Sequence, residues 1–157
     1  MQPAVMTPAS EEAQYSPLVR ILFGTIAAIA LAGVIVSSIS LQRHYAKSKS
    51  EFCDFSQRFS CDVVNRSEYS SIVGIPVAGI GVAGYAALFV LSTFLRNRPE
   101  TPLRLLLAAF AGLAFALYLT YVEAYILTTW CILCLASLLL IFLISVLALA
   151  VKVKTAA

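Results

Sequence analysis

Charged residues are scarce in this sequence. Asp, Glu, Lys and Arg make up 12% of its 157 residues, while apolar residues make up 61%. Water-soluble domains carry about 25% charged residues, so this composition argues against a soluble fold. The net charge is only +3, and the basic residues stand in short groups beside apolar stretches, as they do at membrane ends. We therefore expect no binding to nucleic acid.

The sequence also lacks internal repeats, low-complexity tracts and any segment that reads as a soluble domain. Four apolar stretches occupy most of it instead. At about 1.5 Å per helical residue, each is long enough to cross a hydrocarbon core of about 30 Å. We predict an all-α integral membrane protein, a bundle of four transmembrane helices at about residues 18–41, 72–95, 103–128 and 130–151.

Polar segments flank and separate these spans. We expect a poorly ordered tail at residues 1–17, a long loop at 42–71 and a short C-terminal tail at 152–157, so that residues 18–151 form the single transmembrane domain. A cleaved signal peptide is the competing interpretation of the first span, but the apolar run is too long and acidic residues precede it. Gly74 and Pro76 are expected in the opening turn of the second span, where proline is tolerated.

The four crossings place all four cysteines on one side of the membrane. Cys53 and Cys61 lie in the long loop, and Cys131 and Cys134 begin the fourth span. The basic residues of the opposite side lie directly beside the ends of the apolar spans, which indicates that this side faces the cytoplasm. The cysteines then face a periplasm-like or luminal compartment, where disulfides persist. A multi-pass protein of a bacterial inner membrane fits this arrangement.

The Cys131-Ile132-Leu133-Cys134 motif places two thiols within one helical turn, close enough for a reversible disulfide. Thr128 and Thr129 are candidate caps of this helix. Because the positive end of a helix favours anions, we expect a depressed pKa for a cysteine there. Small apolar filler residues are the alternative interpretation of the motif.

Cys53 and Cys61 argue against that alternative, since they lie in a polar loop with seven residues between them. We interpret them as a mobile second pair. A four-cysteine zinc site is a weaker alternative, because such sites usually combine two short-spaced pairs in soluble modules; no metal is expected. Exchange between the two pairs would carry electrons to an acceptor that dissolves in the membrane.

These features resemble the vitamin K epoxide reductase family, in particular its bacterial members that oxidise thiols for disulfide formation. The resemblance covers about residues 18–151. Its carrying features are the two loop cysteines, Ser67 six residues after the second of them, the Gly74-Ile75-Pro76 entry to the next helix, and Cys131 to Cys134.

The resemblance implies a path for electrons. Cys53 would meet a thioredoxin-fold partner similar to DsbA, Cys61 would exchange with Cys131, and Cys134 would face a quinone of the ubiquinone, menaquinone or vitamin K type. Family members often carry a fused thioredoxin domain. Since this chain ends soon after its last span, we expect a separate partner protein.

Two other functions remain open. Animal enzymes of the family that reduce vitamin K epoxide carry an asparagine early in the second helix and a tyrosine one turn after the CxxC motif, where this chain has Val77 and Leu138. That departure favours a plain quinone acceptor over the epoxide. A non-enzymatic membrane scaffold stapled by disulfides is the third hypothesis. The DsbB-type family places its CxxC motif in the first loop, the reverse of the order here.

Four further residues are weaker candidates. Glu123 lies inside the third span near its outer end, where it could pass a proton to the reduced quinone or simply face headgroup water or a basic partner. Trp130 is either an interfacial anchor or a stacking surface for the quinone. Ser67 either hydrogen-bonds near the reactive cysteines or caps a short segment, and His44 is expected to be a solvated residue at a membrane end.

Overall fold

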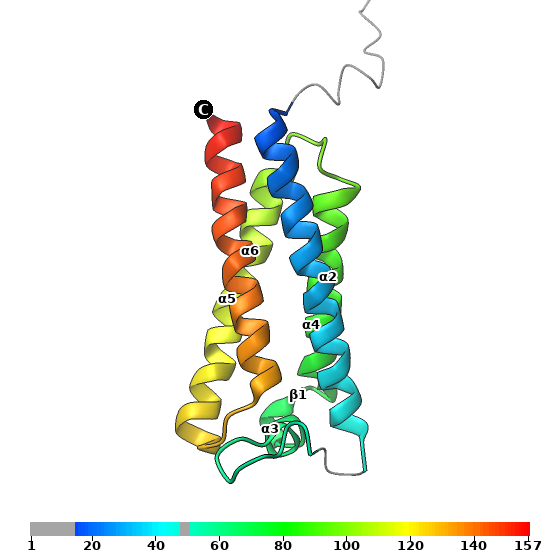
Figure 1. The fold of residues 1–157 in the computed structure, drawn as a ribbon, viewed down its shortest axis with the longest axis vertical. Helices are drawn as coiled ribbons and strands as arrows, with labels where there is room; N and C mark the ends of the chain where they lie inside the picture. Colours follow the sequence, from blue (N-terminus) through cyan, green and yellow to red (C-terminus); the bar gives the residue numbers. More distant parts are fainter. Residues whose placement is uncertain (1–14, 48–50) are drawn as a thin grey trace, which may run out of the picture.

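Long apolar stretches fold as helices in the computed structural model, which describes residues 15–47 and 51–157 (Figure 1). Within these residues four long helices run alternately up and down. Their bounds are α2 Pro17–Tyr45, α4 Val77–Thr93, α5 Thr101–Tyr121 and α6 Ile132–Ala156. The predicted tail up to residue 14, and Lys49 in the predicted loop, lie outside the described residues.

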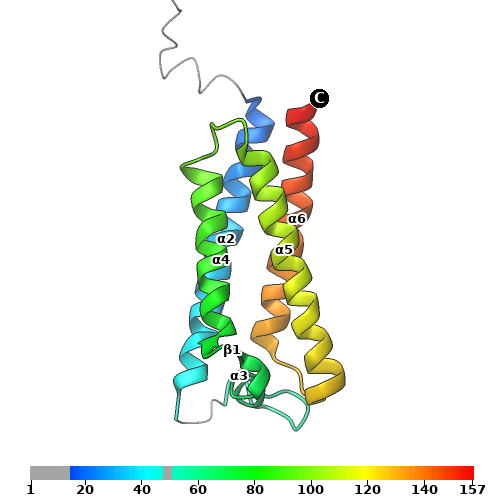
Figure 2. The same ribbon diagram turned by 180° about the vertical axis from the view of Figure 1, so that it is seen from behind.

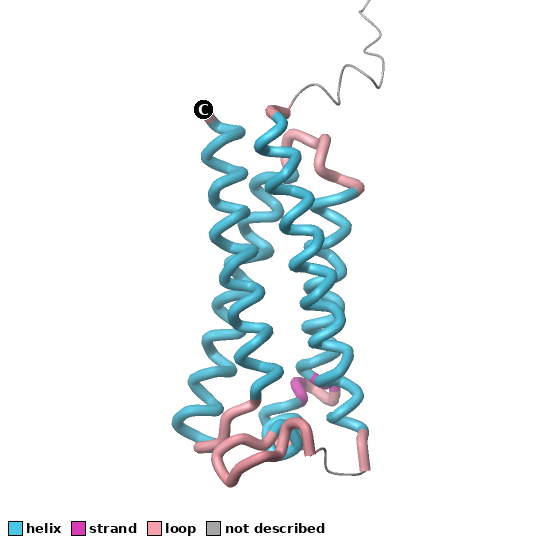
Figure 3. Tube along the Cα trace, in the orientation of Figure 1, coloured by secondary structure: helices cyan, strands magenta, loops and turns pink. Residues whose placement is uncertain are grey.

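Shorter elements fill the end of the bundle that holds the long loop. They are the helix α3 Cys61–Asn65, the 3-10 turn η2 Glu68–Ser70, the strands β1 Ser71–Ile72 and β2 Ile75–Pro76, and the π-helix η3 Val122–Leu127. Figures 2 and 3 show these elements gathered at one end, opposite the C-terminus and the first turn of α2. The segment that joins α4 to α5 also lies at that opposite end.

Three helical segments of the described chain are long and apolar enough to cross a membrane, namely Pro17–Tyr45, Thr101–Leu127 and Ile132–Ala156. The fourth, α4, is equally apolar but has only 17 residues. It is shorter than predicted because residues 72–76 are not helical. Ser71 pairs with Pro76 and Ile72 with Ile75 in a tight hairpin, whose turn residues Val73 and Gly74 both have positive φ.

The prediction that the second helix begins at Ile72 is therefore wrong. A left-handed Gly74 stops a helix, and the residue before a proline is disfavoured in the helical region. Pro76 is the N-cap of α4 rather than a residue of its first turn. The other boundaries shift by a few residues: α2 extends to Tyr45, α5 begins at Thr101, and α6 runs from Ile132 to Ala156 through most of the predicted tail.

The helices pack around α2, which lies against both α4 and α6, while α5 lies against α6 and only loosely against α4. The apolar core in the upper half of the bundle includes Phe23, Ile26, Leu105 and Ile144, all fully or almost fully buried. Gly33 allows α4 to approach α2 closely, since the ring of Tyr85 occupies the space where a Cβ would stand.

Gly33→Ala tests this close approach. A Cβ at Gly33 would lie 2.2–2.5 Å from three ring carbons of Tyr85, and that ring is tied to α6 because its hydroxyl donates to the Ser137 carbonyl (2.8 Å). Overpacking of this kind costs about 1–3 kcal/mol. We expect a lower thermal unfolding midpoint in detergent. Gly24→Ala is the control, because nothing lies within 4 Å of its Cβ position; equal midpoints for the two variants would refute the packing.

Candidate active site

Two backbone hydrogen bonds bring the long loop to the start of α6. The N–H of Ser60 donates to the carbonyl of Trp130 (3.1 Å), and the N–H of Trp130 donates to the carbonyl of Arg58 (2.8 Å). Ser60 and Trp130 immediately precede Cys61 and Cys131. The strand-like pairing of the two segments thus sets one cysteine of the loop beside the first cysteine of the CxxC motif.

Ser60 also starts the short helix that carries Cys61. Its Oγ accepts a hydrogen bond from the N–H of Val63 (3.3 Å), which is the usual way a serine caps a helix. Cys61 is the first residue of α3. A polar loop can therefore present this thiol inward, toward the bundle, because the cap fixes the direction in which α3 begins.

The four cysteines are thiols in this structure and contact one another in the order Cys53, Cys61, Cys131 and Cys134. We call them the sulfur chain. The side chain of Cys61 hydrogen-bonds with those of Cys53 and Cys131. That of Cys131 also bonds with Cys134, and Cys134 in turn bonds with the carboxyl of Glu123. Each step between neighbouring sulfurs is thus within reach of thiol–disulfide exchange.

Three of the four cysteines of the sulfur chain are buried, and Cys134 is half-buried. Cys61 and Cys131 are 0% exposed and Cys53 is 2% exposed, packed in an apolar cluster with Val64 and Leu133. The interpretation of the loop's polar sequence as evidence against apolar packing of Cys53 and Cys61 is wrong for their side chains. The loop is polar along most of its length, but it folds its two cysteines inward against α6.

The expected fall in the pKa of the CxxC thiol is also wrong for Cys131. Its pKa is raised, because its hydrogen bond with Cys134 and its burial both favour the neutral thiol. The pKa of Cys61 is raised as well, by its hydrogen bond with Cys131 and by burial. Neither threonine caps α6: Cys131 itself is the N-cap, and Thr128 is a left-handed residue at the end of η3.

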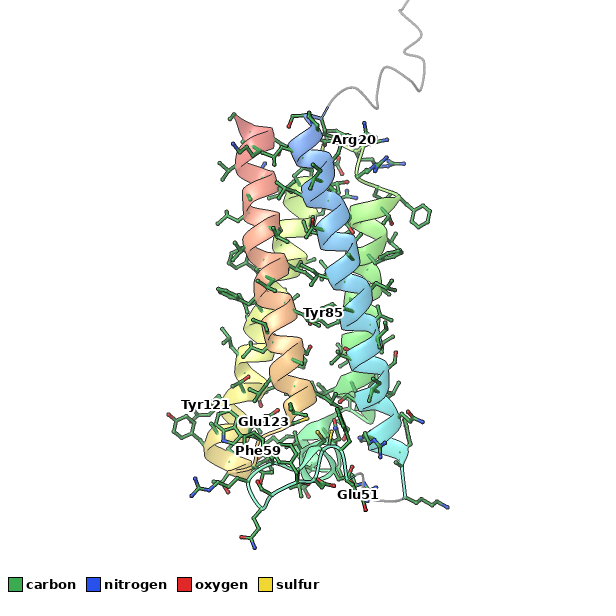
Figure 4. All side chains as sticks on the ribbon, viewed as in Figure 1. Arg20, Glu51, Phe59, Tyr85, Tyr121 and Glu123 are labelled. Carbon is green, nitrogen blue, oxygen red and sulfur yellow. The ribbon has the colours of Figure 1, made fainter. Side chains whose placement is uncertain are left out.

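Glu123 contacts Cys134, at the inner end of the sulfur chain, and Figure 4 shows it at the end of the bundle that holds the long loop. It is 2% exposed, and its Oε2 accepts a hydrogen bond from the N–H of Cys131 (3.1 Å). Among the described residues, Oε1 has no conventional nitrogen or oxygen partner. The interpretation of Glu123 as a residue reaching headgroup water is therefore wrong, because the π-helix η3 turns its carboxyl inward to the start of α6.

A cavity of about 390 Å³ adjoins the carboxyl of Glu123 and lies between α2, α4, α5 and α6. Of the four cysteines, all of which are described, Cys134 alone lines it. Its walls are mostly apolar and include three glycines, Gly81, Gly84 and Gly112. The volume falls in the range of about 300–1,000 Å³ that is usual for small-molecule sites.

Comparison with known proteins agrees with this geometry. Residues 24–149 match the sequence profile of the vitamin K epoxide reductase family. The chain belongs to the vitamin K epoxide reductase family. No curated protein matches the chain. The family consists of oxidoreductases and is associated with quinone and vitamin K substrates, so the match identifies this family member as a membrane redox protein.

The polar groups of the cavity lie in two places. Ser40, His44, Asn65 and Ser67 line the end near the cysteines. Halfway along the bundle, the hydroxyl of Tyr85 donates to the main-chain carbonyl of Ser137 and lies 2.9 Å from its Oγ. Figure 4 shows Tyr85 reaching across the interior of the bundle.

The remaining sequence candidates fall in different places. Trp130 is half-buried and does not line the cavity; its backbone holds the loop. Ser67 lines the cavity, but its hydroxyl donates to the Val64 carbonyl (2.8 Å) and makes no cap. Val77 lines the cavity, whereas Leu138 lines a separate outer hollow. Ser137, the residue before it, faces the cavity instead.

Sequence reasoning did not foresee the burial of three polar residues in or beside the site. His44 is half-buried and its Nδ1 hydrogen-bonds with the carbonyl of Asn65, so the prediction of a solvated side chain is wrong. Asn65 and Asp62 are both 6% exposed. A signal was present in the sequence, since an aspartate directly follows each loop cysteine and Asn65 stands one helical turn after Cys61.

The raised pKa values predict a distinctive pH dependence of thiol alkylation in the fully reduced protein. A thiol whose pKa is raised holds less thiolate at neutral pH. Its alkylation rate should climb about tenfold per pH unit without a plateau up to pH about 10, whereas an ordinary cysteine levels off above about 8.5. Iodoacetamide labelling of Cys61 and Cys131, followed by peptide mass spectrometry with N-acetylcysteine as the reference, measures this.

A plateau below pH about 8 at Cys131 would contradict the account, because it would show the activated thiolate that helix N-termini often produce. The reference thiol separates this effect from the chemistry of the reagent. Burial slows labelling at every pH, so the shape of the curve, rather than the rate itself, carries the result.

Proposed function

We propose that this protein is a membrane thiol oxidase that reduces a quinone. It would take two electrons from a thioredoxin-fold partner, pass them along the sulfur chain and deliver them to a quinone in the cavity. The observation that carries the proposal is the unbroken series of contacts from Cys53 to Cys134, together with the fact that Cys134 alone among the four lines the cavity.

The proposed cycle starts with a disulfide in each pair. A partner thiolate attacks Cys53, the partner's second thiolate releases the partner as a disulfide, and Cys53 and Cys61 become thiols. Cys61 then attacks Cys131, which frees Cys134, and Cys53 displaces Cys131 from the mixed disulfide. The Cys131 and Cys134 dithiol gives two electrons to the quinone and closes again, and the quinone gains two protons to become a hydroquinone.

The exposed surface of the loop supports a partner of this kind. Phe52 and Phe55, on either side of Cys53, are 78% and 59% exposed. Apolar side chains of that size on a polar loop are typical of a protein-binding surface. Because Cys53 itself is 2% exposed, we propose that docking of the partner at these phenylalanines opens the loop enough to admit its thiolate.

We propose that α4 also crosses the membrane, which brings the number of crossings to four. At about 1.5 Å per residue its 17 residues span about 26 Å, slightly less than a hydrocarbon core. The hairpin of β1 and β2 pairs the backbone groups next to its start. We place the end that bears Arg96, Arg98 and Lys152 in the cytoplasm and the sulfur chain on the periplasmic or luminal side.

Glu123 is proposed to handle a proton of this reaction. Its carboxyl contacts Cys134, is fixed by the N–H of Cys131 and lines the cavity. A carboxyl in this position can take the proton that a thiol loses as its sulfur attacks, and give it to the quinone oxygen as charge builds there. We keep quinone reduction ahead of epoxide reduction, since neither Val77 nor Leu138 supplies a hydrogen-bonding side chain.

Cysteine variants test the direction of the relay. We expect every single Cys→Ala variant to abolish ubiquinone-1 reduction driven by a reduced thioredoxin-fold protein. With dithiothreitol as donor, Cys131→Ala and Cys134→Ala should stay inactive, while Cys53→Ala and Cys61→Ala should retain turnover, because the small donor reduces the inner pair directly. Full activity of Cys134→Ala would contradict the proposed electron path. The same assay with vitamin K epoxide in place of the quinone tests the competing reaction.

Glu123→Gln tests the proton role. The amide oxygen still accepts from the N–H of Cys131, but the side chain no longer carries a proton. We expect the turnover number for quinone reduction to fall about 100-fold or more, as is typical when a general acid or base is lost. Exchange between the partner and the loop cysteines should not change. Glu100→Gln, which removes an exposed carboxyl at the other end of the bundle, is the control; equal turnover numbers for the two variants would exclude the role.

A further inference from the structure

We propose that the side-chain amide of Asn65 donates a hydrogen bond to one carbonyl oxygen of the bound quinone and so positions the ring against Cys134. This inference rests on the proposed function, and it assigns a binding residue that the two cysteine pairs do not identify. It is carried by the burial of Asn65, the contacts that fix its side chain and its place in the cavity wall.

The side chain of Asn65 is held in one orientation. Its Oδ1 accepts a hydrogen bond from the hydroxyl of Ser40 (2.8 Å) on α2, so its Nδ2 must point away from that contact. Two more contacts hold this segment at the end of α2. The carbonyl of Asn65 hydrogen-bonds with His44, and the guanidinium of the next residue, Arg66, donates to the Ala46 carbonyl. These contacts make Asn65 a rigid part of the cavity wall.

The Nδ2 group is buried, yet it has no hydrogen-bond partner among the described residues. Asn65 is 6% exposed and lines the cavity together with Cys134. A buried donor without a hydrogen-bond acceptor costs about 1–3 kcal/mol of stability, so such a group generally binds a ligand or an ordered water. An unpartnered donor in the wall of an apolar cavity favours a ligand that offers an acceptor.

A quinone ring offers two acceptors at opposite positions, and the cavity has a polar group for each. Glu123 stands beside Cys134 at the inner end of the sulfur chain. Asn65 belongs to α3 and follows Val64, which packs in the same cluster as Leu133 and Cys134. A neutral N–H donor also stabilises the negative charge that develops on the quinone oxygen during reduction without offering a competing proton.

The rest of the cavity fits the other part of such a substrate. Away from the cysteines its wall is apolar and passes Gly81, Gly84 and Gly112 toward the middle of the bundle. A polyprenyl tail needs a mostly apolar path of this kind, and the polar contact halfway along it is already made, because the hydroxyl of Tyr85 donates to the Ser137 carbonyl. The polar head of the ligand is then restricted to the end where Asn65, Glu123 and Cys134 lie.

The test compares Asn65→Leu and Asn65→Asp with wild type. Aspartate is nearly isosteric and keeps the oxygen that accepts from Ser40, but it has no N–H to donate. We expect the KM for ubiquinone-1 to rise about tenfold in both variants, the usual effect of one lost hydrogen bond. Disulfide exchange between the partner and the loop cysteines should keep its wild-type rate, which also shows that each variant is folded. Ser38→Ala, which removes an exposed hydroxyl on α2, the helix that carries Ser40, is the control.

Infrared spectroscopy of bound ubiquinone-1, labelled with ¹³C at one carbonyl at a time, reads the contact directly. In the wild type one carbonyl stretch should be shifted to lower frequency, and the shift should vanish in Asn65→Leu but persist in Ser38→Ala. Unchanged KM values and an unchanged spectrum in both Asn65 variants would overturn this inference alone. A wild type that neither binds nor reduces ubiquinone-1 would overturn the proposed function with it.

Discussion

The structure of the site depends on the pairing of the loop with the residues just before α6. Trp130 donates one backbone hydrogen bond to Arg58 and accepts another from Ser60, so the residues that precede Cys61 and Cys131 are fastened together. Without this pairing the long loop would have no fixed place relative to the bundle. Its value lies in position rather than in energy, since each such hydrogen bond contributes only about 1 kcal/mol net.

Burial of the sulfur chain follows from that pairing and sets its chemistry. Thiols packed among Val64 and Leu133 ionise less readily than thiols in water, and the pKa values of Cys61 and Cys131 are raised accordingly. Reactivity then has to come from proximity, because a thiol held against its target sulfur needs no high concentration of thiolate in bulk water. The same burial slows the reaction of the sulfurs with thiols in solution, and it leaves Cys134 and Glu123 facing the cavity.

Local signals were enough to predict the apolar helices and the gathering of four cysteines at one end, because hydropathy and the CxxC spacing are properties of contiguous residues. They failed where the outcome depends on distant segments. The inward turn of Cys53 arises from contacts that no window of sequence contains. Asn65 was missed for the same reason, since its role depends on Ser40, 25 positions earlier. The hairpin before α4 is different, because its pairs lie within residues 71–76 and Gly74 and Pro76 are a local signal for it. Glu123 was noticed as an unusual charge, but only the π-helix shows that it turns inward.

The central claim is that a loop thiol lies against a thiol of the CxxC motif, and a variant that keeps only that pair tests it most directly. In the double variant Cys53→Ala, Cys134→Ala, the remaining cysteines are Cys61 and Cys131. Mild oxidation with oxidised glutathione, followed by digestion and mass spectrometry, should give the Cys61–Cys131 disulfide within single molecules in nearly full yield. Recovery of the two cysteines as separate glutathione adducts, or as links between molecules, would contradict the account.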